Sequence, residues 1–159
     1  MLYYLGRSQV TGFEVYALAI PSPAALPDAV TLSSPEFTCL LAWDAAEVES
    51  AVTSDLMEKL LQMGCVYLCC WGQGCELRHD IMDEVIAGEG NSQWPEQGIV
   101  TTWHVEDSPD DALEFFLDLA SPTDRKWRQC HSALVLIIGC DPGLVLNPLR
   151  RKLLGGSAG

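Results

Sequence analysis

Apolar runs of strand length alternate with helical patterns along most of this chain, and this alternation constrains the fold more than any other feature. From residue 37 onward the order is strand, helix, strand, helix, strand, helix, strand. Short strands joined by helices form right-handed crossovers, which give a parallel sheet covered by helices on both faces. The expected strands are 37–43, 66–70, 99–104 and 133–139, and the expected helices are 46–63, 75–87 and 108–120. We therefore predict an α/β fold, a three-layer Rossmann-like sandwich with a mostly parallel sheet.

The two ends of the chain predict additions to this sheet. Residues 2–5 and 13–20 both have strand patterns and are separated by a glycine-containing turn, which favours an antiparallel hairpin at the sheet edge. After the last strand, Pro142 and Pro148 lead us to expect only a short segment.

The length of 159 residues fits one domain with a core of its own. We predict a single domain over 1–154 and a flexible tail over 155–159. No run approaches the roughly 18 apolar residues that cross a bilayer, and the N-terminus lacks a secretory signal pattern. The seven cysteines mostly lie in or beside apolar runs, which favours reduced, buried thiols and therefore a cytoplasmic protein.

Charge is distributed unevenly along the chain. Residues 1–124 carry three basic and 21 acidic residues, whereas residues 125–159 carry six basic residues and one acidic residue. The net charge of −13 repels nucleic acid and would attract a basic partner. The alternative explanation is that this charge only keeps the protein soluble.

Polar residues follow each of the predicted strands, at the edge where parallel sheets bind their ligands. Two of these residues, Glu76 and His104, are candidates for acid–base catalysis. The candidate ligand-binding residues are Asp44, Trp71, Gly72, Gly74, Cys75, His79 and Asp141. Loops are generally polar in α/β proteins, so the alternative is that these residues only build the loops.

Gly72-Gln73-Gly74 before a helix could cradle a phosphate, because glycines let backbone amides approach an anion there. The dinucleotide pattern G-x-G-x-x-G is not completed, since position 77 is leucine, and a tight turn is the alternative. Asp44, Glu76 and Asp141 are chemically suited to magnesium. Their spacing does not require a metal, and we predict no metal site.

The sequence of the expected helix that begins at Cys75 indicates two further kinds of chemistry. Glu76, His79, Asp80 and Asp83 fall on one stripe, which could perform acid–base chemistry or simply be the solvated face. A cysteine at a helix N-terminus should have a lowered pKa, so Cys75 could act as a nucleophile.

The base of such a hydrolase would be His104, with Glu106 as the third member. The alternative is that His104 packs or caps a loop. The tryptophans Trp43, Trp71 and Trp103 each end a predicted strand, so they could line a pocket, form an exposed patch, or close the edge of the core.

Two resemblances to known families add expectations. The segment Trp71…Cys75-Glu76-Leu77 after an apolar strand resembles the W-C-x-x-E-L region of TIR domains, where a strand leads into a helix with a catalytic glutamate. This resemblance implies that Glu76 would cleave NAD. In that family two residues separate the cysteine from the glutamate, whereas here they are adjacent.

The second resemblance is to an uncharacterised bacterial family of small α/β domains. It is carried by Cys70-Trp71-Gly72, Cys75-Glu76, His79-Asp80, Asp83-Glu84 and Val100-Thr101-Thr102-Trp103-His104. This resemblance implies a bacterial origin and no particular activity.

These observations lead to two hypotheses about function. The first is a small acidic cytoplasmic protein, similar to an immunity protein or antitoxin or serving as an accessory subunit, that binds a basic protein partner. The second is an enzyme or sensor that holds a nucleotide or another small ligand at the strand ends. We expect binding of neither nucleic acid nor membranes, and the oligomeric state stays open.

Overall fold

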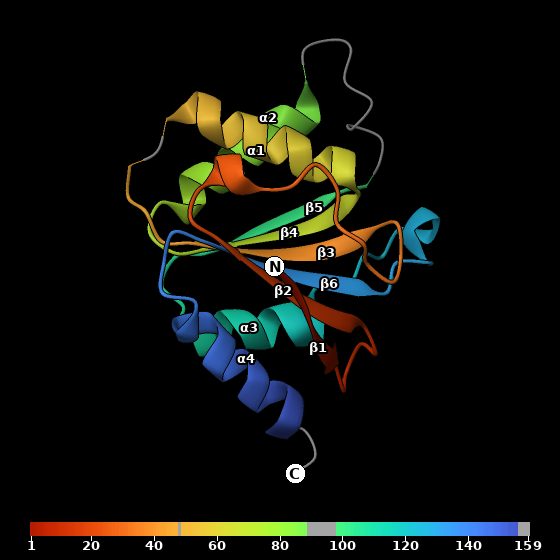
Figure 1. Cartoon of the computed structure of the whole chain (residues 1–159). Coiled ribbons are helices and arrows are strands. Elements are labelled where there is room, and N and C mark those ends of the chain that lie inside the picture. Colours follow the sequence, from red (N-terminus) through yellow and green to blue (C-terminus); the bar gives the residue numbers. More distant parts are fainter. Residues whose placement is uncertain (48, 89–97, 156–159) are drawn as a thin grey trace.

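The computed structural model describes residues 1–47, 49–88 and 98–155 (Figure 1). A six-stranded sheet with the order β1-β2-β6-β3-β4-β5 forms its middle layer. The strands are β1 (Leu2–Arg7), β2 (Glu14–Ile20), β3 (Phe37–Trp43), β4 (Cys65–Trp71), β5 (Val100–His104) and β6 (Ser132–Ile138). The helices are α1 (Ser50–Met63), α2 (Cys75–Ala87), α3 (Pro109–Leu119) and α4 (Gly143–Gly155), with short 3-10 turns η1 (Pro23–Ala25) and η2 (Arg125–Trp127).

The sheet pairing confirms the predicted fold class. β1 pairs with β2 in the antiparallel direction, and every other neighbouring pair is parallel. Helices α1 and α2 cover one face, and α3 and α4 cover the other (Figure 1). The result is the three-layer sandwich that the alternation of strands and helices predicts.

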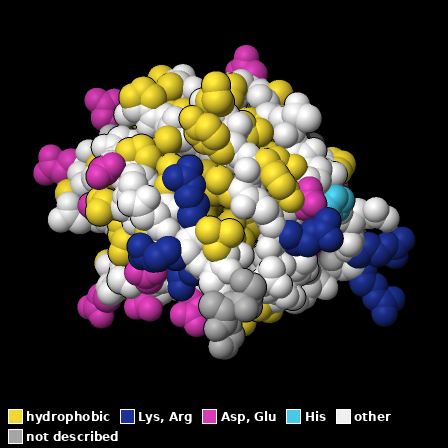
Figure 2. Space-filling model, turned by 60° about the horizontal axis from the view of Figure 1, so that its bottom comes forward, with side chains coloured by type: hydrophobic (Ala, Val, Ile, Leu, Met, Phe, Trp, Pro, Cys, Tyr) yellow, Lys and Arg dark blue, Asp and Glu magenta, His cyan; other side chains and the backbone are white. Residues whose placement is uncertain are grey.

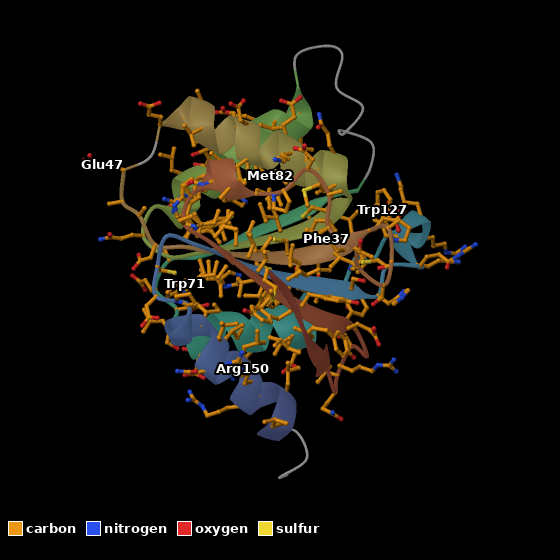
Figure 3. The ribbon with its side chains drawn as sticks, in the orientation of Figure 1. Phe37, Glu47, Trp71, Met82, Trp127 and Arg150 are labelled. Atoms are coloured by element: carbon orange, nitrogen blue, oxygen red, sulfur yellow. The ribbon has the colours of Figure 1, made fainter. Side chains whose placement is uncertain are left out.

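Two apolar cores separate the sheet from its helices. Phe37 and Met82 belong to the core under α1 and α2 (Figure 3), and Phe116 belongs to the core above α3 and α4. Strands β3 and β6 are buried at every residue, because helices cover both of their faces. Their continuous apolar sequences follow from this position.

Two helices differ from the sequence-based prediction. α1 begins at Ser50, four residues later than predicted, and α4 is a full helix where we expected a short segment. Pro148 lies inside α4 and is buried together with Val145 and Leu149. Proline removes one backbone N–H from a helix, and here the burial of the apolar side of α4 outweighs that loss. Most of the predicted tail, residues 156–159, lies outside the described residues.

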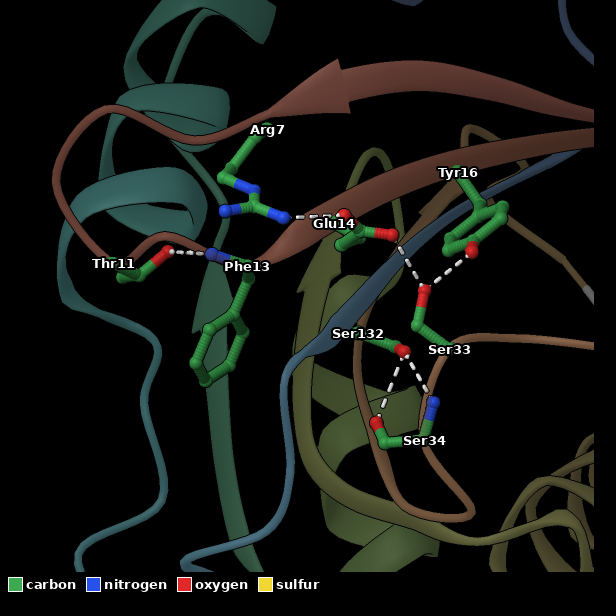
Figure 4. A network of polar contacts seen from close by, with 8 residues as sticks. All are labelled: Arg7, Thr11, Phe13, Glu14, Tyr16, Ser33, Ser34 and Ser132. Atoms are coloured by element: carbon green, nitrogen blue, oxygen red, sulfur yellow. Dashed lines mark hydrogen bonds and ion pairs between the residues drawn. The ribbon is translucent and has the colours of Figure 1, made fainter.

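Hydrogen bonds connect the segment before β3 to strands β2 and β6 (Figure 4). The backbone N–H of Ser34 donates to Oγ of Ser132 at 2.9 Å, and the two hydroxyl oxygens also lie 2.9 Å apart. Oγ of Ser33 donates to Glu14 at 2.8 Å and lies 2.5 Å from the hydroxyl of Tyr16. These bonds fix the amino ends of β2, β3 and β6 relative to one another.

The glycines after α1 and in β1 allow a matched test of steric crowding. Gly64 (φ 111°) ends α1, and Gly6 (φ 127°) lies in β1, both in a conformation that L residues rarely adopt. A Cβ at Gly64 would overlap the carbonyl oxygen of Pro35, whereas a Cβ at Gly6 has nothing within 4 Å. We expect Gly6→Ala to cost about 1–3 kcal/mol from backbone strain alone. Gly64→Ala should cost about 1–3 kcal/mol more, from overpacking against the backbone.

Urea unfolding of both variants measures the difference between them. Equal destabilisation of the two variants would show that the contact with Pro35 does not limit this position.

Candidate functional site

A buried arginine occupies the space between the loops that follow β3 and β4. Arg78 is 3% exposed, and its guanidinium lies 4.2 Å from the ring centroid of Trp43. It donates hydrogen bonds to the carbonyl oxygens of Trp43 at 2.8 Å and Gln73 at 2.6 Å, and to that of Ala45. The guanidinium group of Arg78 thus occupies part of the predicted ligand site. Sequence reasoning missed Arg78, although a single cation among the acids of this helix was a visible signal.

The glycine-containing turn before α2 is shaped by its contact with the loop after β3. Oδ1 of Asp44 accepts a hydrogen bond from the backbone N–H of Gln73 at 2.8 Å. Gly72 (φ 110°) and Gly74 (φ 78°) both have positive φ angles. A Cβ at Gly72 would lie 2.7 Å from the carbonyl oxygen of Trp43. The close approach of two loops accounts for these glycines without a phosphate, which favours the tight-turn alternative.

The surroundings of Cys75 and His104 differ from those of a cysteine hydrolase. Cys75 is fully buried, and burial raises the pKa of its thiol, opposed by a hydrogen bond from the backbone of His104. The predicted lowering of this pKa by the helix is therefore wrong, because desolvation is the larger effect. Glu76, the neighbouring candidate, is exposed in the first turn of α2.

The ring of His104 is held by other residues than those predicted. Its Nδ1 lies 3.0 Å from Oδ2 of Asp107, and its Nε2 lies 3.0 Å from Oγ1 of Thr102. Its ring packs 4.7 Å from that of Phe115 in α3. His104 is 9% exposed, so both nitrogens are engaged inside the fold. These contacts agree with a packed histidine at the end of β5, whose carboxylate partner is Asp107 and not the predicted Glu106.

The acidic stripe of α2 lies beside β5. Nδ1 of His79 lies 3.1 Å from Asp80 and its Nε2 lies 3.4 Å from Asp83, while its ring centroid is 4.4 Å from that of Trp103. Oγ1 of Thr101 donates to Asp83 at 2.6 Å. Among the described residues, no group of three or more His, Cys, Asp or Glu side chains is placed to hold a metal ion.

The end of β6 lies near an open hollow. This hollow, of about 380 Å³, is lined by Ala19, Ile20, Pro21, Gly139, Cys140 and Pro142. Asp141 lies three residues after the end of β6, and its Oδ1 accepts a hydrogen bond from the backbone N–H of Gly143 at 3.1 Å. Asp141 therefore caps the start of α4 and does not line the hollow.

The three strand-end tryptophans have different environments. Trp43 is buried under Arg78, and Nε1 of Trp71 (labelled in Figure 3) donates to the carbonyl oxygen of Asp107 at 2.8 Å. Trp103 is 46% exposed. They therefore do not line one pocket together, and only Trp103 presents a large aromatic surface to solvent.

Exposed charges complete this picture of the surface around Trp103. The exposed charged residues of α2 are all acidic: Glu76, Asp80, Asp83 and Glu84. We call these four residues together with Thr101 and Trp103 the α2–β5 face. On the side that carries α4, Lys and Arg side chains lie among hydrophobic and acidic ones (Figure 2). Of the helices described, none is long and apolar enough to cross a membrane.

Comparison with known proteins identifies a family. No curated protein and no solved structure matches the chain significantly. Residues 15–143, which extend from the second residue of β2 to the first residue of α4 and include the whole α2–β5 face, match the family described as "Domain of unknown function (DUF7684)". Because this match covers far more than half of the 159 residues, the chain belongs to the DUF7684 family.

Proposed function

We propose that this protein is a small acidic interaction protein of the bacterial cytoplasm that binds a basic protein partner through the α2–β5 face. It would act as an immunity-like or antitoxin-like inhibitor, or as an accessory subunit. The side chains of Asp44, Trp71 and His104 are already bonded to neighbouring residues of the fold, which leaves the surface as the better place for recognition.

One observation carries the proposal: a half-exposed tryptophan lies beside a helix whose exposed charges are all negative. Arg78, the only lysine or arginine of α2, is turned into the core, so it does not neutralise this surface. Tryptophan is enriched among residues that dominate binding energies. Carboxylates around such an anchor attract basic partners and repel acidic ones. The uneven charge of the sequence agrees with this arrangement.

Affinity capture with matched variants tests the proposal. The immobilised protein is incubated with extract of its native host at low salt, and bound proteins are eluted with high salt. We expect a basic protein that the wild type captures. The variant Asp80→Asn, Asp83→Asn, Glu84→Gln should bind the purified partner about tenfold more weakly, since these charges steer association.

The control variant removes the same number of negative charges, three, from α1 and the residue before it. Glu49→Gln, Asp55→Asn, Glu58→Gln removes three carboxylates at or near α1, whereas the exposed tryptophan among the described residues, Trp103, lies on β5 beside α2. This variant should retain wild-type affinity within about twofold. If no protein is captured at low salt, or if both variants lose the partner equally, the proposed function or its location on α2 is wrong.

A second candidate function is favoured by the hollow beside β2 and β6. The connection after β2 contains η1, which packs against α1 on one face of the sheet, whereas the connection after β6 leads into α4 on the other face. Ligands bind where connections diverge in this way. A nucleotide or a similar small ligand could bind there. Nucleotides and NAD are screened by thermal shift, because a ligand of the folded state raises the melting temperature. A shift that is lost when the lining residue Cys140 is enlarged, as in Cys140→Phe, supports this candidate, and a flat screen excludes the compounds tested.

A further inference from the structure

β5 lies at an edge of the sheet, and its sequence lacks the residues that commonly prevent another strand from adding to an edge. Along the part of the chain that the structure describes, it pairs with β4 alone, residue by residue from Val100 to His104. Edge strands leave alternate backbone N–H and C=O groups without a strand partner, and proteins commonly protect them with lysine, proline or a bulge. β5 contains neither lysine nor proline, and its pairing with β4 is regular. At the other edge, the pairing of β1 with β2 shifts between Tyr4 and Gly6.

The two sides of β5 offer different surroundings to an added strand. Thr101 and Trp103 lie on the side of α2, where they contact Asp83 and His79. Thr102 and His104 bond to each other, and His104 packs against α3. The side chains of an added strand would alternate between these two sides. On the α2 side they would meet carboxylates next to an exposed indole ring, a combination that suits arginine and lysine.

We infer that the basic partner contributes an extended segment that adds to β5 as a further strand, with basic residues at alternate positions facing Trp103 and α2. This inference rests on the proposed function and specifies how the partner binds. Backbone hydrogen bonds along the edge supply affinity, and the row of alternate side chains supplies specificity. The charge of the α2–β5 face selects a basic segment over an acidic one.

Peptides that differ only in their backbone N–H groups test this mode. The probe is a capped peptide of alternating arginine and valine, and two derivatives carry N-methyl groups either on every arginine or on every valine. Backbone N–H groups of successive residues in a strand point to opposite sides, so only one methylated set faces β5. We expect the two derivatives to differ in affinity by about tenfold or more, because only one of them loses the bonds to the edge.

Amide hydrogen exchange and two matched variants locate the probe. Binding of the unmodified peptide should slow exchange in Val100–His104. Trp103→Ala should weaken binding about tenfold, as expected for an aromatic anchor. Tyr4→Ala, which removes an exposed aromatic residue from the other edge strand, should leave the affinity unchanged.

The outcomes separate this inference from the proposed function. If both N-methyl peptides bind equally well, charge alone attracts them; strand addition is then overturned and the proposed function stands. Protection of β1 in place of β5, or no binding of any peptide at low salt, also overturns strand addition. The capture experiment decides the proposed function independently, because it does not depend on these peptides.

Discussion

Raising the pH from 7 to about 9.5 is expected to destabilise the folded protein steeply, because buried thiols cannot ionise until the chain unfolds. Burial raises the pKa of Cys39, Cys65 and Cys70 well above the ordinary range and that of Cys69 to about 12. In the unfolded chain these thiols ionise near pH 8.5 to 9. A group whose pKa is raised by folding stabilises the fold fully below its unfolded pKa, and this stabilisation is lost as the pH rises towards the folded pKa.

The size of this effect follows from the number of thiols. Each buried thiol lowers the free energy of unfolding by about 1.4 kcal/mol per pH unit once its unfolded counterpart is ionised. Four such thiols give a slope of roughly 5.6 kcal/mol per unit, against a typical total stability of about 5–15 kcal/mol. The protein should therefore unfold within about one to three pH units above about pH 9.

Urea unfolding in reducing buffer at several pH values up to about 9.5 measures this slope. Cys69→Ala provides the internal control, since it should reduce the slope by about 1.4 kcal/mol per unit, whatever it costs at pH 7. A stability that stays constant between about pH 8 and 9.5 would contradict the burial of these thiols.

Replacing Arg78 by methionine is expected to cost about 3–5 kcal/mol, comparable to breaking a buried charged pair. The substitution leaves the carbonyl oxygens of Trp43, Gln73 and Ala45 without their donor and removes the cation from the Trp43 ring. Unsatisfied buried acceptors account for most of the loss. For a domain of this size, we expect the melting temperature to fall by roughly 10 °C.

Two further variants distinguish the geometry of Arg78 from its charge. Arg78→Lys keeps the charge but cannot span three carbonyl groups, so it should recover only a small part of the stability. Arg125→Met removes an exposed cation and should change stability by less than about 0.5 kcal/mol. If Arg78→Met is as mild as Arg125→Met, the loops after β3 and β4 do not depend on this side chain.

The parallel sheet was predictable because its central strands, β3 and β6, are covered on both faces. The sequence of β6 is apolar at every position after Ser132, and the start of α3 has a serine cap whose Oγ accepts a hydrogen bond from the backbone N–H of Asp111. Such local signals identify an element without knowledge of its neighbours. α4 was not predicted as a helix, because Pro148 weakens the local pattern and only burial against the sheet compensates for it.

The arrangement of the strand ends was much harder to predict. That parallel strands bring Asp44, Gly72 and His104 to one edge of the sheet follows from topology. Two contacts depend on distances between loops, which no local sequence pattern contains. Arg78 turns inward to the carbonyl group of Trp43, and His104 contacts Asp107 and not Glu106. The exposure of Trp103 beside the acidic stripe likewise results from β5 lying at the edge. The sequence shows which chemical groups follow the strands, but it does not show which of these groups contact one another.

The position of β6 between β2 and β3 has a consequence for how the chain is made. β2 and β3 each pair with β6 and not with each other, so the last strand in the sequence forms the centre of the sheet. A ribosome delivers β2 more than a hundred residues before its parallel neighbour, and such distant pairings form slowly. Until β6 emerges, the unpaired backbone edges and apolar side chains of β2 and β3 remain available to other nascent chains. The protein is therefore expected to acquire its native sheet only late in translation.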